Sequence, residues 1–166
     1  LNFLPKNVFN VEGEEFLEMN LLGEKIPNPI GLAAGFDKSA EVYNSLFKLG
    51  YGFIEVGTIT PKRQLGNPKP RVFRLENDQA LINRLGFNNH GSEVVSKRIA
   101  DNLPSGFLGI NVGPNKDTKN KEEDYYFCLS RLSSYAGYLT INISSPNTEG
   151  LRDFHEKREL EKLLTG

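Results

Sequence analysis

Residues 30–56, IGLAAGFDKSAEVYNSLFKLGYGFIEV, predict one complete strand–helix–strand unit. The apolar run 30–34 predicts a buried strand, and FIEV at 53–56 predicts a second one. Between them, residues 39–49 predict a helix with Ser39 as its N-cap. A helix that joins two short apolar strands is typical of a parallel sheet, because parallel strands need a long crossover connection.

The same alternation runs along the rest of the chain. A strand over 16–22, closed by a Gly23-Glu24 turn, predicts an opening hairpin. The fold class is therefore α/β, with about four β/α units behind a hairpin. Two architectures begin in this way: a doubly wound open sheet, and a (β/α)8 TIM barrel, which normally needs about 250 residues. Further strands are expected at 107–112 and 138–143, and further helices at 92–103, 121–135 and 156–164.

The connection over residues 58–89 is long, polar and rich in proline and basic residues. Within it, VFRL (72–75) and ALIN (80–83) flank the turn-forming residues 76–79, which predicts a β-hairpin. A connection of this length inside a compact domain is unusual unless it has a function. We therefore expect it to contribute to a site.

Composition narrows the classes of function. Twenty basic and 21 acidic residues give the 166-residue chain a net charge of −1, which gives no reason to expect nucleic acid or an anionic membrane surface as the main partner. One cysteine, Cys128, excludes an internal disulfide, and with two histidines it makes a Cys/His metal site unexpected. The apolar runs are too short for a transmembrane helix. The chain opens on Leu1, which we interpret as a processed or excised start that leaves preceding targeting or membrane segments open.

Ligands bind at the carboxyl ends of parallel strands in both architectures, and here those ends hold small, amide or hydroxyl residues. Ala and Gly let a flat ring lie close to the backbone, and Asn side chains offer both a donor and an acceptor. Lys38 adds a positive charge. These properties suit a planar heterocycle with imide-like edges, such as a flavin or a pyrimidine, rather than a metal ion. The candidate segments are 33–38, 57–58, 83–88, 111–113 and 142–147.

Each signal also has a simpler explanation. Ala33-Ala34-Gly35 is compatible with an ordinary tight turn after a strand, and Asn111 and Asn142 with turn formers at strand ends. Ser144 to Asn147 alone would be a turn, and the basic residues of the long connection a solvated face. Cys128 is expected in the core. A lysine near a helix start is disfavoured by the helix dipole, so the position of Lys38 favours a functional role.

Four strings of the sequence, taken in order, resemble dihydroorotate dehydrogenase, in particular its class 2, membrane-linked, quinone-reducing form. They are NPIGLAAGFDK (28–38), GFIEVGTITPKRQLGNPKPRVFRL (52–75), INRLGFNNHG (82–91) and INISSPNTEGLR (141–152). The resemblance extends from about Phe16 to the end of the chain. AAGFDK and SSPNT are its specific parts, whereas the helices between them are not specific.

The resemblance implies that residues 1–166 are the N-terminal part of a single FMN-binding (β/α)8 barrel domain, with 58–89 as a long active-site loop. It implies a flavin site formed by Ala33, Ala34, Gly35, Lys38, Gly57, Thr58, Asn111 and Asn142. It implies a substrate site formed by Lys38, Asn83, Arg84, Leu85, Gly86, Phe87, Asn142 and Asn147. It implies no metal.

By the same resemblance, Ser145 is the catalytic base that takes the proton from C5 of dihydroorotate while a hydride passes from C6 to flavin N5. Class 1 enzymes carry Cys at this position, so Ser145 indicates class 2. A free hydroxyl is a poor base, so a relay is needed, with Thr148 and a water near Phe87 as candidates. Arg74 matches an arginine beside the quinone tunnel.

The expected function is oxidation of dihydroorotate to orotate in pyrimidine biosynthesis, with electrons passing from FMN to ubiquinone. The expected location is the mitochondrial inner membrane in a eukaryote, or the plasma membrane in a bacterium. The expected partners are the C-terminal half of the barrel, in the same or a second chain, and a membrane contacted only through helices before Leu1; no nucleic acid is expected. The alternatives are another FMN barrel acting on a dihydropyrimidine or dihydrouridine, and a non-catalytic half-barrel binding module.

Overall fold

The computed structural model describes residues 15–166, so the interpretation of the opening stretch 1–10 lies outside the described residues. Its centre is a parallel sheet in the order β3 (Gly31–Leu32), β4 (Phe53–Ile59), β7 (Phe107–Val112) and β8 (Tyr138–Ile141). Each strand pairs with the next parallel strand along the chain. A doubly wound sheet reverses its strand order at a switch point, and no reversal occurs here. The order is that of one part of a barrel wall.

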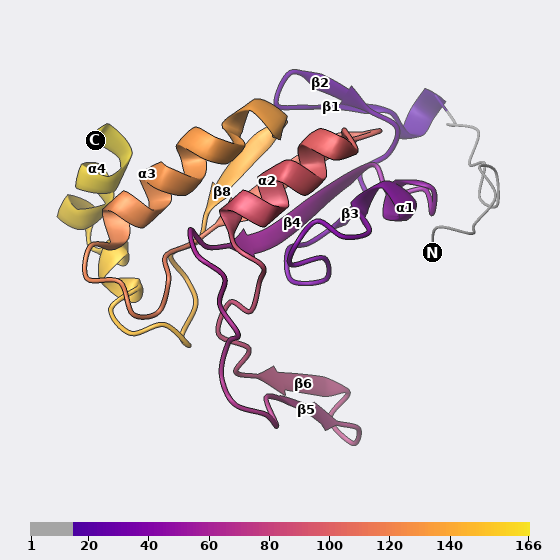
Figure 1. Ribbon diagram of the computed structural model, residues 1–166. Helices are drawn as coiled ribbons and strands as arrows, with labels where there is room; N and C mark the ends of the chain where they lie inside the picture. Colours follow the sequence, from indigo (N-terminus) through magenta and orange to yellow (C-terminus); the bar gives the residue numbers. More distant parts are fainter. Residues whose placement is uncertain (1–14) are drawn as a thin grey trace.

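The helices α1 (Tyr43–Phe47), α2 (Ser92–Asp101) and α3 (Lys121–Leu132) lie on the same face of this sheet (Figure 1). A helix after each of the first three strands on one face is the arrangement of the outer layer of a (β/α)8 barrel. The remaining helical elements are the 3₁₀ turns η1 (Glu15–Leu17), η2 (Ser133–Tyr135) and η3 (Arg152–His155), and the helix α4 (Lys157–Thr165).

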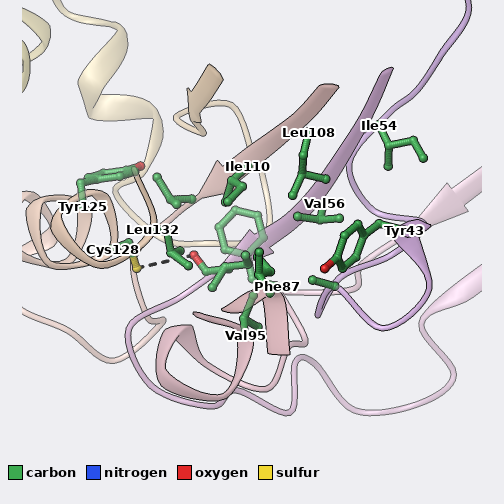
Figure 2. Packing of buried hydrophobic residues seen from close by; sticks show 14 of the residues in the cluster. Tyr43, Ile54, Val56, Phe87, Val95, Leu108, Ile110, Tyr125, Cys128 and Leu132 are labelled. Carbon is green, nitrogen blue, oxygen red and sulfur yellow. Dashed lines mark hydrogen bonds between the residues drawn. The ribbon is translucent and has the colours of Figure 1, made fainter. Parts of the chain in front are cut away.

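The core fills the space between the sheet and the helices (Figure 2). Alternate strand residues such as Ile54, Val56, Leu108 and Ile110 are fully buried against it, as the period of a strand requires. The helices contribute a second set, which includes Val95, Ile99, Tyr125, Cys128 and Leu132. The prediction that Cys128 belongs to the core is confirmed.

Two hairpins lie at opposite ends of the sheet (Figure 1). The first, β1 (Met19–Leu21) with β2 (Glu24–Ile26), lies where the parallel strands begin. The second, β5 (Val72–Leu75) with β6 (Ala80–Asn83), projects beyond the end where they finish. Both hairpins were predicted from the sequence, but the opening strand expected over 16–22 covers only Met19–Leu21, since Glu15–Leu17 form the 3₁₀ turn η1. The second brings its connection close to the carboxyl ends of the strands.

The helix predicted from Ser39 begins instead at Tyr43, so the N-cap assignment was wrong. The carboxylate of Asp37 accepts the backbone N–H groups of Glu41 and Val42, both at 2.8 Å, and holds the intervening residues in an irregular turn. The Ser39 hydroxyl accepts a hydrogen bond from the backbone of His90 at 3.1 Å. Its side chain thus links two loops rather than starting a helix.

The strand boundaries also differ from those predicted. The strand expected over 30–34 covers only Gly31–Leu32, because the chain turns over the end of the next strand immediately afterwards. The strand expected over 53–56 continues to Ile59, since pairing with β7 continues past a local irregularity. The strand expected over 138–143 ends at Ile141.

Candidate active site

The loop after β3 folds across the carboxyl end of β4. Gly35 donates its backbone N–H to the carbonyl of Gly57 at 2.9 Å, and Gly57 donates to the carbonyl of Asp37 at 3.0 Å. Gly57 has a φ of +115°, and a Cβ there would lie 2.3 Å from the carbonyl oxygen of Asn111. Only glycine fits this position, and its lack of a side chain allows β4 and β7 to approach closely at the end of the sheet.

A cavity of about 330 Å³ opens at this end of the sheet. Its wall combines the loop after β3, the end of β4, the last part of the long connection and the segment after β8. Residues far apart in the sequence therefore meet in one place. The lining residues are Ala34, Gly35, Lys38, Thr58, Asn83, Leu85, Gly86, Phe87, Asn142, Ser144, Ser145, Pro146 and Asn147.

Not every candidate residue lines this cavity. Ala33 and Gly57 are chain neighbours of lining residues, and Asn111 lies beneath Thr58 and Asn142. The Arg84 side chain donates to the carbonyl of Pro70 at 3.1 and 2.9 Å, so its charge is directed into the base of the hairpin.

Arg74 lies on β5 of the projecting hairpin and does not line the cavity either. Arg74 is close in sequence to the lining residues of the connection. Its strand, however, belongs to a two-stranded sheet that is separate from the parallel sheet. From this part of the connection, the residues that line the cavity are Asn83, Leu85, Gly86 and Phe87.

Lys38 brings a positive charge to the cavity wall. Within residues 15–166 it has no ion-pair partner. Burial, and secondarily the charge of Arg71, lower the pKa of Lys38 from its ordinary value. Lys38 also borders a neighbouring cavity of about 480 Å³ that Arg63 and Arg71 line. A desolvated ammonium group without a counter-ion is suited to bind an anionic or strongly polar ligand.

Ser145 lies on the segment that follows β8, at the cavity wall. Its hydroxyl oxygen accepts a hydrogen bond from the backbone N–H of Asn147 at 3.2 Å. A donor in this position stabilises negative charge on the oxygen and leaves the hydroxyl proton free to transfer. Thr148, the proposed relay partner, follows closely and is 4% exposed.

Three polar side chains from neighbouring strands form a connected layer at the base of the cavity. Thr58 donates its hydroxyl proton to Asn111 Oδ1 at 2.6 Å. Asn142 donates through Nδ2 to Thr58 Oγ1 at 3.0 Å and to Asn111 Oδ1 at 3.3 Å. Asn142 Oδ1 in turn accepts the backbone N–H of Ser144 at 3.2 Å. The layer links the end of β4 to the segment that carries Ser145.

Sequence reasoning missed two residues that support this layer and the loop beside it. Glu55, within the otherwise apolar strand FIEV, accepts a hydrogen bond from Asn111 at 2.8 Å. Asn89, 4% exposed, bonds Thr60, Gly91 and Phe87 through its side chain. A charged residue in a strand predicted to be buried was a signal for Glu55, because such residues are rarely buried without partners.

Residues 15–166 contain no group of three or more His, Cys, Asp or Glu side chains placed to hold a metal ion. None of the helices described combines the length and apolar character needed to span a bilayer.

The family model and the curated relatives that match this chain carry the same description. The family model described as dihydroorotate dehydrogenase matches residues 16–166. A curated dihydroorotate dehydrogenase (quinone) of Bradyrhizobium diazoefficiens is 52% identical over 165 residues, which cover 99% of this chain and 45% of that protein. Another from Bartonella tribocorum is 53% identical over 148 residues, 89% of this chain and 41% of that protein. The chain thus spans less than half the length of these relatives.

Solved structures agree with the sequence comparison. A crystal structure of DHODH from Eimeria tenella in complex with ferulenol superposes with a TM-score of 0.88 at 46% identity, covering 98% of this chain and 45% of that one. The ligand-free crystal structure from the same organism gives a TM-score of 0.89 at 46% identity, with 98% and 47% coverage. The four strands and their helices therefore correspond to one half of a TIM-barrel protein.

Proposed function

The chain belongs to the dihydroorotate dehydrogenase family, and from this premise we propose that the whole protein oxidises dihydroorotate to orotate with FMN as cofactor and a quinone as electron acceptor. The observation that carries the proposal is the single cavity in which Lys38, Asn142 and Ser145 meet. One of these residues supplies a cation, one an amide and one a proton acceptor. The reaction removes a hydride from C6 and a proton from C5. The proposed flavin would accept the hydride, and Ser145 would accept the proton.

The residues present fit a flavin. Ala34 and Gly35 present a wall without bulky side chains, and the layer of Thr58, Asn111 and Asn142 presents amide and hydroxyl groups at its edge. We propose that these residues, with Ala33, Gly57 and Lys38, hold the isoalloxazine ring. FMN held there would supply a two-electron acceptor for the hydride from C6, with a quinone as the next acceptor.

Ser145 takes the proton from C5 in this proposal. The Asn147 N–H bond to Ser145 Oγ supports the negative charge that develops when the hydroxyl proton leaves towards Thr148 or a water. Lys38, Asn83, Leu85, Gly86, Phe87, Asn142 and Asn147 line the space for the pyrimidine. Arg84, whose side chain bonds the carbonyl of Pro70, would hold the segment that carries Asn83 and Leu85 rather than contact the ligand.

The remaining partners also belong to the proposal. The C-terminal half of the barrel, as the continuation of this chain or as a second chain, would complete the site. We place Arg74 of the projecting hairpin on the path of the quinone. The names of the bacterial relatives include a quinone. We propose ubiquinone as the acceptor, at the plasma membrane of a bacterium or at the mitochondrial inner membrane of a eukaryote.

The test uses the full-length protein and the variant Ser145→Ala. We expect FMN to remain bound, and reduction of the flavin by dihydroorotate to slow by at least about 100-fold, the range of general base catalysis. Stopped-flow absorbance of the flavin measures this rate. Ser130→Ala, on the exposed face of α3, is the matched control and should reduce flavin at the wild-type rate. Equal rates for Ser145→Ala and the control would remove Ser145 from the mechanism.

A further inference from the structure

Glu55 occupies the middle of β4, on the sheet face that points away from the helices. Its two carboxylate oxygens receive three hydrogen bonds from the neighbouring strands. Asn111 Nδ2 donates to Oε1 at 2.8 Å, while the hydroxyls of Tyr138 and Thr140 donate to Oε2 at 2.9 and 3.1 Å. No lysine or arginine within residues 15–166 forms an ion pair with it.

An ionised carboxylate accepts hydrogen bonds and donates none. Asn111 must therefore turn its NH₂ group towards Glu55, which leaves its Oδ1 facing Thr58 and Asn142. Asn142 must then donate through its own NH₂ group, which leaves its Oδ1 to accept from Ser144. The Glu55 carboxylate at one end of the layer can only accept, and the Ser144 N–H at the other end can only donate, so both ends impose the same direction on the bonds between them.

We propose that Glu55 is a positioning residue that, together with the Ser144 N–H, fixes the amide orientation of Asn111 and Asn142, and so the pattern of donors and acceptors presented to the bound flavin. The proposal rests on the proposed function, because it needs a flavin at this layer. Glu55 itself acts only through the two asparagines.

The charge of Glu55 argues for this role over simple strand packing. Taking a carboxylate out of water without a cation is costly. A glutamine in the same place would satisfy Asn111, Tyr138 and Thr140 equally well, since hydroxyls both donate and accept. A glutamine also offers an NH₂ donor, so it could bond the oxygen of a flipped Asn111 amide. It would therefore not enforce one orientation of Asn111. The carboxylate is needed only if one orientation must be enforced.

The experiment measures FMN binding to the full-length protein and its Glu55→Gln variant. Glu93→Gln, at an exposed position in the first turn of α2, is the matched control because it removes the same charge. We expect Glu55→Gln to raise the FMN dissociation constant about tenfold, and to change the visible spectrum of the bound flavin. We also expect kcat to fall when FMN is saturating. Thermal melting checks that both variants are folded.

Exchanging the carboxylate and the amide between positions 55 and 111 tests the direction of the hydrogen bonds in the layer. In Asn111→Asp, two carboxylates face each other where a hydrogen bond now lies, and FMN binding should weaken by more than in Glu55→Gln. In Glu55→Gln/Asn111→Asp, the glutamine introduced at position 55 donates to the aspartate introduced at position 111, which still accepts from Thr58 and Asn142. This double variant should bind FMN more tightly than Asn111→Asp alone.

The outcomes separate the two proposals. If Glu55→Gln binds FMN with the affinity and spectrum of Glu93→Gln, Glu55 is not a positioning residue. If Glu55→Gln does not fold, the comparison of Asn111→Asp with the double variant decides, and a double variant no better than Asn111→Asp overturns the proposal. If the wild-type full-length protein neither binds FMN nor oxidises dihydroorotate, the proposed function fails instead.

Discussion

Lys38 shows how a single residue can favour ligand binding at the expense of folding. Its ammonium group is desolvated and close to Arg71, and both effects lower its pKa below the ordinary value of 10.5. Between the lowered pKa and 10.5, the unfolded chain binds more protons than the folded one. The free energy of unfolding therefore rises with pH in this window, and the full cost of the charge is present below it.

Lys38→Met should consequently stabilise the protein without ligands at pH 7, with an advantage over the wild type that shrinks as the pH approaches 10.5. The same variant should weaken binding of FMN or orotate by roughly 1.5–3 kcal/mol, because a charge-assisted contact is lost. Urea unfolding of the cofactor-free full-length protein across pH, together with ligand titrations at pH 7, measures both effects. A variant that is less stable than the wild type and binds ligands normally would contradict this account of Lys38.

Cys128 provides a second test at the level of one residue. It is fully buried on α3, and burial, with a smaller contribution from Asp124, raises the pKa of its thiol to about 12. Thiol reagents at pH 8 should leave Cys128 of the native protein unmodified and should label it after unfolding. Because the unfolded thiol ionises first, its contribution to stability should decline as the pH rises from about 9 towards 12. Rapid labelling of the native protein would show that α3 opens easily.

At the scale of the elements, polar contacts hold the connection between β4 and α2 in place. Its two ends meet in an isolated bridge, in which Gln64 and Asn89 exchange backbone hydrogen bonds of 3.1 and 2.9 Å. The buried amide of Asn89 then satisfies the backbone of Thr60 and Gly91 and the carbonyl of Phe87. One side chain thus holds the base of the loop that carries Asn83 to Phe87.

Asn89→Ala should destabilise the full-length protein by about 3 kcal/mol, because several buried backbone groups lose their partners. It should also weaken substrate binding, since Phe87 and its neighbours would no longer be held at the cavity. Asn77→Ala, in the exposed hairpin turn, is the control and should change neither property. Urea denaturation and the KM for dihydroorotate report the two effects. Wild-type values of both for Asn89→Ala would mean that the loop is held by other contacts.

Sequence patterns predicted these elements where the determining contacts are local. The hairpin around residues 76–79 and the helix α3 depend on nearby residues and were found close to their true limits. The start of α1 was missed because the Asp37 carboxylate holds Glu41 and Val42 in an irregular turn, and because the Ser39 hydroxyl is bonded to His90, which lies 51 residues away. Glu55 was missed for the same reason, since its partners lie on β7 and β8.

The candidate site was easier to predict than its internal bonds. Carboxyl ends of parallel strands meet at one end of a sheet whatever the details of pairing, so the lining segments could be expected to converge. Which amide meets which hydroxyl depends on the strand register, such as Asn111 opposite Thr140, and no local pattern encodes that. The direction in which Arg84 turns was equally beyond prediction from sequence.

At the scale of the whole molecule, the sheet has two open edges. Within residues 15–166, β3 pairs only with β4, and β8 pairs only with β7. The face opposite the helices is also more polar than the apolar strand sequences suggested, because it carries Glu55, Asn111 and Thr140. A closed barrel would pair both edges and cover this face, as the coverage of about half of each related structure implies.

Residues 1–166 expressed alone should therefore associate through their strand edges and bind FMN poorly. Co-expression with the remaining half of the barrel should give a stoichiometric complex that retains the flavin. Light scattering after size-exclusion chromatography, with flavin absorbance, compares the two samples. A yellow, monomeric and cooperatively melting segment would contradict the barrel interpretation, and most of the site assignments with it.

The bridge between Gln64 and Asn89 has a consequence for how such proteins can diverge. A loop whose two ends are bonded to each other can change in length at little thermodynamic cost. Doubling the length of a flexible loop adds only about 0.6 kcal/mol to the entropic cost of closing it. Insertions and deletions in the hairpin beyond this tie should therefore be tolerated by the sheet. Evolution could vary the tip of the hairpin, which is proposed to meet the electron acceptor, while leaving the parallel sheet unchanged.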